Sequence, residues 1–146
     1  MSLQVWDGQG TVLADTSAWM FARRDPQARE LLFDAIERGD VAWCWPVRYE
    51  LIVDARGSEG IAAVDRALEG LREVAVDCSV QRGVLSTMRE MAGSGSHGAH
   101  RLPLTDLTVA VAAQRSGLDV LHHDHHFERL SELLAIRALW IGDPSA

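Results

Sequence analysis

The sequence contains no lysine, only two cysteines and no long apolar run. A membrane-spanning helix needs about 20 consecutive apolar residues, and no segment of the 146-residue chain approaches that length, so we expect no membrane association. Cys44 and Cys78 are expected to be buried and reduced, with one disulfide as the alternative. The first residues show no basic region followed by an apolar core, so we expect a cytoplasmic location.

Positive charge is also scarce. The formal net charge is −7, and all 14 basic residues are arginine. Nucleic-acid binding usually relies on clustered positive charge, so this balance disfavours a broad phosphate-binding surface. Two points weaken the objection: a bound cation would cancel part of the negative charge, and arginine is well shaped for bidentate phosphate contact. The missing lysine also has a plain explanation in genomic base composition.

The length and the hydrophobic fraction of 47% suit one globular domain over residues 1–146. We expect residues 1–10 to form an N-terminal extension, either packed through Trp6 or partly a cloning remnant. Beyond it, strand-like and helical segments alternate, which predicts an α/β fold with a mostly parallel sheet covered on both faces. The expected strands are 11–15, 41–45, 73–76, 119–122 and 136–141. The expected helices are a short one after residue 17, then 26–38, 46–56, 58–71, 79–92, 104–116 and 128–134.

Four acidic residues occupy positions where expected strands end or helices begin: Asp15, Glu50, Asp106 and Asp124. In an open α/β sheet the carboxyl ends of the strands line the ligand crevice. Carboxylates gathered there would repel one another, and a divalent cation would neutralise them. The pattern therefore predicts metal-dependent chemistry.

Each acid also has a structural explanation. Asp15 suits a helix N-cap, with Thr16 and Ser17 capping the next turn or holding a water on a metal. Glu50 could be a solvated helix residue, although its apolar neighbours favour a specific contact. Asp106 in a first helical turn is favoured by the helix macrodipole. The functional interpretation depends on the acids occurring together.

The segment His122-His123-Asp124-His125-His126-Phe127 suggests zinc or nickel at first sight. Adjacent residues on a strand or turn point apart, however, so at most two of these histidines could share one ion. We therefore expect most of them to lie on the rim of the crevice. His122 is expected to be buried, Phe127 to fill the core, and His125 or His126 to contact a phosphate.

Several other polar residues are candidates for substrate contact. Arg23, Arg24 and Arg101 could position a phosphodiester backbone, and His97 and His100 could extend a small basic rim around Arg101. The alternative for that rim is a solvated loop. Asp54 lies one turn after Glu50, and we expect it to be solvated or paired with Arg48 or Arg56.

Four short motifs carry a resemblance that covers residues 11 to the end. They are Asp15-Thr16-Ser17, Tyr49-Glu50-Leu51, Pro103-Leu104-Thr105-Asp106 before an alanine-rich helix, and Leu121-His122-His123-Asp124-His125-His126-Phe127. In order and spacing they resemble the PIN domain, and more narrowly the VapC toxins of bacterial VapBC toxin–antitoxin pairs. The resemblance implies a three-layer α/β/α sandwich with a sheet of four to five strands. It also implies an Mg²⁺- or Mn²⁺-dependent ribonuclease that is commonly dimeric and is inhibited by a VapB-like antitoxin.

Carried over by motif, the metal-binding acids would be Asp15, Glu50, Asp106 and Asp124. One departure matters: many relatives have an acidic residue where this chain has His126. The prediction is a metal-dependent endoribonuclease that hydrolyses RNA and acts as a type II toxin, with Thr16, Ser17, Arg23, Arg101 and His126 as possible substrate contacts.

Three other functions have some basis in the sequence. The His126 departure motivates a catalytically weak or inactive PIN-like module that acts through protein–protein binding. A phosphoacceptor receiver-type domain generally needs a lysine, which the chain lacks. A phosphatase with Asp15 as nucleophile would normally need a second aspartate at position 17, which is serine.

Overall fold

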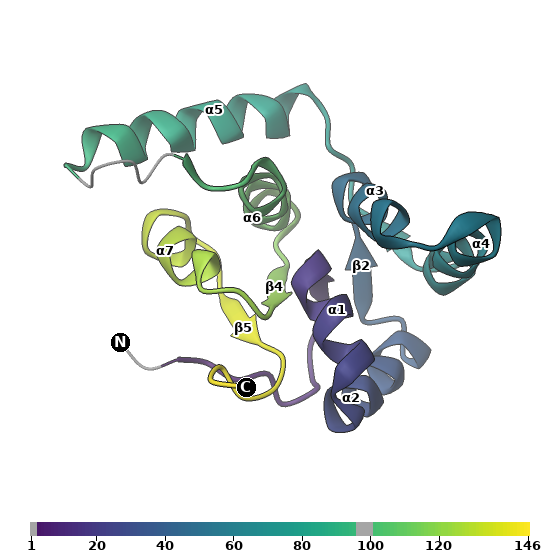
Figure 1. Cartoon of the computed structure of the whole chain (residues 1–146). Helices are drawn as coiled ribbons and strands as arrows, with labels where there is room; N and C mark the ends of the chain where they lie inside the picture. The colour runs from purple at the N-terminus through teal and green to yellow at the C-terminus, as the bar shows by residue number, and fades with distance from the viewer. Residues whose placement is uncertain (1–2, 96–100) are drawn as a thin grey trace.

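A computed structural model describes residues 3–95 and 101–146 (Figure 1). Strands and helices alternate along most of the chain, as the sequence predicts. The strands are β1 (Val12–Ala14), β2 (Val41–Trp43), β3 (Arg72–Glu73), β4 (Asp119–His122) and β5 (Ala138–Trp140). The helices are α1 (Thr16–Arg24), α2 (Pro26–Glu37), α3 (Trp45–Asp54), α4 (Gly57–Leu68), α5 (Cys78–Gly93), α6 (Leu104–Ser116) and α7 (His126–Leu133).

The five strands form one parallel sheet in the order β3-β2-β1-β4-β5. The chain moves outward from β1 through β2 to β3, then returns to the other side of β1 with β4. The strand order therefore reverses beside β1, and an open parallel sheet has its ligand crevice at such a switch point. This sheet confirms the predicted α/β fold and places the carboxyl ends of β1 and β4 next to each other.

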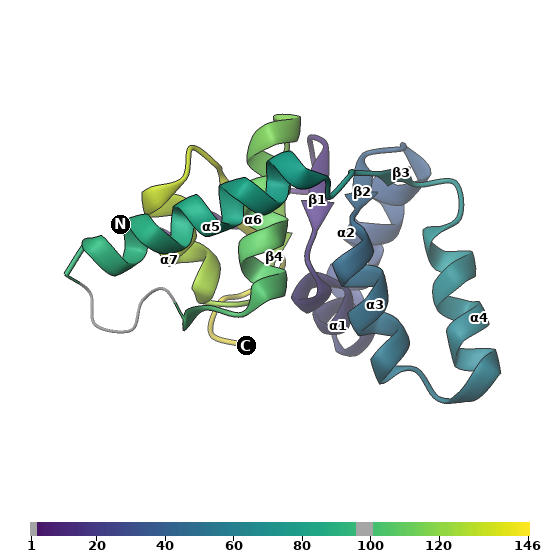
Figure 2. The same ribbon diagram turned by 90° about the horizontal axis from the view of Figure 1, so that it is seen from above.

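Helices cover both faces of the sheet (Figures 1 and 2). Helices α1 and α2 lie on one side and α5, α6 and α7 on the other, while α3 and α4 flank the β2 and β3 side. Within the parts of the chain that the structure describes, none of the helices has the length and apolar character that a membrane crossing requires.

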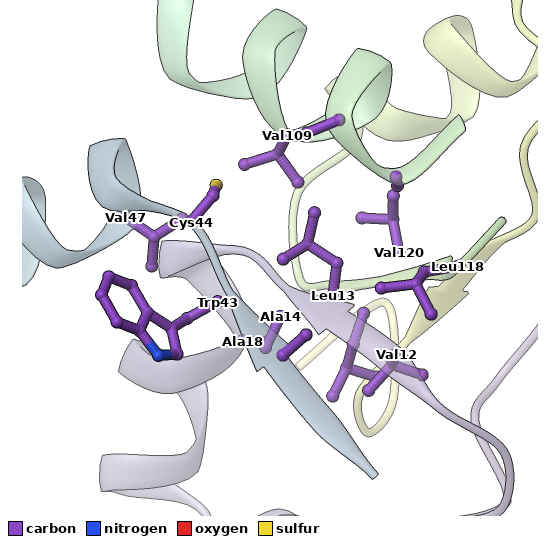
Figure 3. Packing of buried hydrophobic residues seen from close by; sticks show 14 of the residues in the cluster. Val12, Leu13, Ala14, Ala18, Trp43, Cys44, Val47, Val109, Leu118 and Val120 are labelled. Atoms are coloured by element: carbon purple, nitrogen blue, oxygen red, sulfur yellow. The ribbon is translucent and has the colours of Figure 1, made fainter. Parts of the chain in front are cut away.

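The core is built around β1 and α6. All three residues of β1 are completely buried, and so is nearly every side chain of α6 from Leu107 to Ala113. Figure 3 shows Leu13 on the side of the sheet that faces Val109 of α6, and Ala14 beside Ala18 of α1. This alternation is the two-residue period of a strand covered on both faces. The small, apolar α6 sequence suits a helix enclosed by its neighbours.

The N-terminal residues extend the β5 side of the sheet. Val5 forms an isolated parallel bridge with Trp140, and Trp6 donates its backbone N–H to the Trp140 carbonyl at 2.8 Å. The Trp6 side chain is buried. The expected packing of the extension through Trp6 is therefore correct.

Some expected boundaries and one expected burial were wrong. Strand β2 ends at Trp43, because Trp45 already begins α3, and α7 begins at His126 rather than Glu128. Both cysteines are free, and Cys44 is buried, but Cys78 is exposed. The reason is local: Cys78 is the first residue of α5, and Asp77 caps that helix by accepting the Val80 backbone N–H at 3.1 Å.

The close approach of Gly142 to Phe21 provides a test of the packing. Gly142 has φ +77°, and a Cβ there would lie 2.5 Å from Phe21 Cε2. Gly117 has φ +68° but no neighbour within 4 Å of a Cβ. We predict that Gly117→Ala lowers the free energy of unfolding by about 1 kcal/mol through backbone strain. Gly142→Ala should lower the free energy of unfolding by about 1–3 kcal/mol more than Gly117→Ala does, because the new methyl group would overpack against Phe21. Urea denaturation measures both, and equal losses would contradict this packing.

Candidate metal centre

Asp15 lies at the carboxyl end of β1 and is almost completely buried, with 2% of its surface exposed. It caps α1: its Oδ2 accepts the Ser17 backbone N–H at 3.0 Å and the Ser17 hydroxyl at 2.6 Å. Its other oxygen, Oδ1, is buried and has no hydrogen-bond partner among the described residues. A buried carboxylate oxygen without a partner is costly in a folded protein. Asp15 is therefore a helix cap with one oxygen left for another ligand.

The surroundings of Asp15 disfavour its charged form. Burial, joined by the negative charges of Asp106 and Glu50, raises the pKa of Asp15 to about 7, although the Ser17 hydrogen bonds act in the opposite direction. A cation near Oδ1 would reverse that balance, because an opposite charge favours the ionised carboxylate.

Asp106 lies in the first turn of α6, with only 7% of its surface exposed. His126 Nδ1 lies 2.6 Å from Asp106 Oδ2, within hydrogen-bond distance, and 3.3 Å from Asp124 Oδ1. One ligand atom from each of these three residues lies within 4.8 Å of the others. Burial raises the pKa of Asp106, the His126 hydrogen bond lowers it, and the charges of Asp124 and Glu50 raise it. Asp106, Asp124 and His126 therefore form one compact acidic cluster.

Glu50 lies on α3, outside this group of three, and its charge acts on Asp15 and Asp106. The Thr16 hydroxyl donates to Glu50 Oε1 at 2.6 Å across 34 residues of sequence, which points the carboxylate toward the end of β1. Its charge contributes to the raised pKa of Asp15, of Asp106 and of the buried Cys44, whose pKa reaches about 12 chiefly through burial. Glu50 is thus a directed, half-buried side chain rather than a solvated one.

Backbone groups after β4 hold the loop that carries Asp124. The His123 backbone N–H donates to the Ser17 hydroxyl oxygen at 2.9 Å, and Ser17 in turn donates to Asp15. The Asp124 N–H donates to His122 Nδ1 at 3.1 Å, and the His126 N–H donates to Asp124 Oδ1 at 3.0 Å. These bonds join the β4–α7 loop to the tip of β1.

The histidines diverge, as their adjacency predicts. His122 is completely buried, and burial lowers its pKa to about 4, so its ring is neutral. The His123 ring stacks on Phe21 at 3.8 Å between centroids, and the His125 ring contacts Glu128. Only His126 of this segment reaches the acids. Phe127 is completely buried, as predicted.

The basic candidates lie in other settings. Arg23 forms an ion pair with Asp54 at 2.8 Å. Asp54 is exposed, as the solvated alternative predicted, but its partner is neither Arg48 nor Arg56. Arg48 pairs with Asp65 at 2.6 Å, because α4 packs beside α3. Arg101 is exposed.

The other basic residues predicted to contact the substrate are Arg24, His97 and His100. The guanidinium of Arg24 lies over the Phe21 ring at 4.7 Å. The basic rim predicted for His97 and His100 lies outside the described residues.

The chemistry of the four acids fits a divalent cation. Carboxylate oxygens are the ligands that Mg²⁺ and Mn²⁺ prefer, and an imidazole nitrogen is better tolerated by Mn²⁺. The unpartnered Oδ1 of Asp15 and the raised pKa of both buried aspartates indicate a site whose charge is not balanced by the protein alone. The residues present therefore fit a bound metal.

A parallel sheet with an acidic crevice at its switch point defines the class of this protein. The family model for the PIN domain matches residues 12–133. The chain belongs to the PIN domain family, which confirms the family predicted from the motifs.

Named relatives share most of the chain. It is 29% identical over 127 residues to ribonuclease VapC18 of Mycobacterium tuberculosis, covering 87% of this chain and 92% of the relative. It is 27% identical over 120 residues to ribonuclease VapC21 of the same species, covering 82% and 86%. These names agree with the narrower resemblance to VapC toxins.

Solved structures of VapBC complexes share the fold. One from Salmonella typhimurium, bound to DNA, has a TM-score of 0.72 at 20% identity and covers 90% of this chain and 98% of that chain. VapBC-5 from Mycobacterium tuberculosis has a TM-score of 0.61 at 18% identity and covers 91% and 100%.

Sequence reasoning missed how Thr16, Ser17 and His126 act in the structure. Thr16 directs Glu50, Ser17 bridges Asp15 to the loop after β4, and His126 lies between two acids. The hydroxyl pair directly after Asp15 was the available signal for the first two. For His126 the signal was its spacing of two residues from Asp124, the position at which the resemblance predicted an acidic residue.

The buried charge of Asp15 predicts a pH-dependent stability. Its pKa rises from 3.8 to about 7 on folding, so the folded state holds this proton more tightly. The resulting stabilisation is complete below pH 3.8 and is lost as the pH rises to about 7. In chelator, Asp15→Asn should therefore gain stability over wild type between pH 5 and pH 8, by roughly 1–3 kcal/mol.

Urea denaturation at both pH values measures the effect. Asp34→Asn, which removes an equal charge from the exposed face of α2, is the control and should show no such trend. If the free energies of unfolding of wild type and Asp15→Asn differ by the same amount at pH 5 and pH 8, a raised pKa for Asp15 is contradicted.

Proposed function

We propose that the protein is a divalent-metal-dependent endoribonuclease that acts as the toxin of a type II toxin–antitoxin pair. Membership of the PIN family and the ribonuclease names of its relatives support the reaction. The observation that carries the proposal is the grouping of Asp106, Asp124 and His126, whose ligand atoms lie within 4.8 Å of one another. Beside them, the pKa of buried Asp15 is raised in part by the charges of Asp106 and Glu50, and its Oδ1 has no partner among the described residues.

Asp15, Asp106, Asp124 and Glu50 are the proposed metal-binding and catalytic residues. When bound, Mg²⁺ or Mn²⁺ would neutralise charge on the phosphate and activate water for attack on phosphorus. Ser17 holds Asp15 by two hydrogen bonds, and Thr16 holds Glu50, so their roles are to orient carboxylates.

His126 supports activity rather than its loss. Its ring nitrogen lies within hydrogen-bond distance of Asp106 and makes a polar contact with Asp124, so the position is filled by a group that can donate to the acids or bind a cation. An imidazole nitrogen also favours Mn²⁺ over Mg²⁺. The alternative of an inactive module that only binds proteins is therefore not favoured.

The proposed partners are RNA and a VapB-like antitoxin. Structures of VapBC complexes share this fold, which supports a partner of that kind. The excess of negative charge suits an antitoxin that offers an arginine to the acids. We further propose a homodimer that acts in the cytoplasm as a single domain.

The activity itself gives the test. We predict that the purified protein cleaves RNA with Mn²⁺ or Mg²⁺, more strongly with Mn²⁺, and not in chelator. Asp106→Asn should lower kcat/KM by about 100-fold or more, because removing an electrostatic contributor commonly costs that much. Asp34→Asn should behave as wild type. Equal rates for wild type and Asp106→Asn would identify a contaminating nuclease and overturn the proposal.

A further inference from the structure

A pocket of about 370 Å³ opens beside the acidic cluster, and the proposed function does not use it. Its walls come from α3, α6 and the residues around the start of α5. We call it the Trp45–Tyr49 pocket; the residues that matter here are Trp45, Tyr49, Glu50, Gln81, Leu104 and Thr105.

The pocket shares Glu50 with the proposed metal centre. Glu50 lines the pocket, while the Thr16 hydroxyl bonds its Oε1. The same helix that carries Glu50 carries Trp45 and Tyr49. The two aromatic rings therefore lie on the same helix as one of the carboxylates proposed to hold the metal.

The pocket walls are unusually apolar for an exposed surface. Trp45 is 53% exposed, Tyr49 is 60% exposed and Leu104 is 71% exposed. The rings of Trp45 and Tyr49 meet edge to face, with centroids 6.2 Å apart and planes at 79°. Because the rings meet edge to face and each residue is more than half exposed, part of their aromatic surface remains accessible to a ligand. Aromatic rings of this kind bind nucleobases by stacking, and every base offers a flat π-face.

The charge balance favours stacking over phosphate attraction. The chain carries a net charge of −7, and the nearby arginines are already paired: Arg48, on the same helix as the two rings, with Asp65, and Arg23 of α1 with Asp54. RNA binding that relied on free arginines would be weak here. The Gln81 amide and the Thr105 hydroxyl add polar groups at the pocket wall that can meet the edges of a base.

We propose that the Trp45–Tyr49 pocket binds an unpaired nucleobase of the RNA substrate, next to the phosphodiester that is cut. The proposal rests on the proposed function and narrows the substrate to single-stranded RNA. Base-paired RNA is excluded, because its bases are stacked within the helix and cannot enter the pocket.

The test compares Tyr49→Ala and Trp45→Ala with Tyr49→Phe and Phe33→Ala. Phe33 is 54% exposed, as the pocket rings are, but lies on α2 away from the pocket. With a single-stranded RNA and Mn²⁺, each pocket alanine should raise KM about tenfold, the loss expected for one stacked base. Its kcat should change less than threefold. Tyr49→Phe and Phe33→Ala should match wild type.

Binding is measured separately with a short single-stranded RNA that contains 2-aminopurine, whose fluorescence is quenched on stacking. We use Asp106→Asn as the background so that the RNA stays intact. The quenching should persist in 0.3 M salt and disappear in the Tyr49→Ala and Trp45→Ala double variant. Mn²⁺ binding by calorimetry should be unchanged by the pocket substitutions, which separates a lost base contact from a damaged metal site.

Each outcome decides the question. Wild type that cuts no RNA defeats the proposed function, and the fluorescence assay then still decides whether the pocket stacks a base. Wild type that cuts RNA, with Tyr49→Ala indistinguishable from Phe33→Ala, overturns the pocket alone. Light scattering tests whether a second copy of the chain occupies this surface instead of a base. A dimer that becomes monomeric in Tyr49→Ala would assign the surface to that second copy and overturn the proposal.

Discussion

The burial of two carboxylates beside other acids is the constraint on which this site depends. Asp15 and Asp106 are almost completely buried, and each is disfavoured as an anion by burial and by the charge of its neighbours. A protein retains such a cluster only if something balances it. Among the described residues, Asp106 shares a hydrogen bond with His126, while Asp15 Oδ1 has no partner. A divalent cation would relieve the remaining imbalance and would at the same time provide the chemistry that a phosphodiester needs.

The fold creates this crowding through its topology. Strand β1 lies in the centre of the sheet, and β2 and β4 run parallel to it on either side. The ends of β1 and β4 therefore meet, and helices α1 and α7 begin there. Short polar links then set the side chains: Ser17 ties the tip of β1 to the loop after β4, and Thr16 reaches across to Glu50. Asp15 directly follows the buried strand β1, and Asp106 lies in the buried helix α6, so the apolar core holds both side chains in place.

Much of the fold could be predicted from the sequence, because its periodic signals are local. The apolar runs before Asp15 and Asp124 read as buried strands, and the bounds of α6 and β4 were predicted correctly. The orientation of individual side chains could not be predicted. Nothing local shows that Arg23 pairs with Asp54, or that His126 reaches Asp106, because these contacts depend on how helices pack. The exposure of Cys78 was missed since it depends on where α5 begins.

Anomalous X-ray diffraction from crystals grown with Mn²⁺ tests the central claim most directly. The account predicts an anomalous peak at the carboxyl end of β1, in contact with Asp15 Oδ1 and with carboxylate oxygens of Asp106 and Asp124. A peak only at another surface, or saturating Mn²⁺ with no peak among these acids, would contradict it.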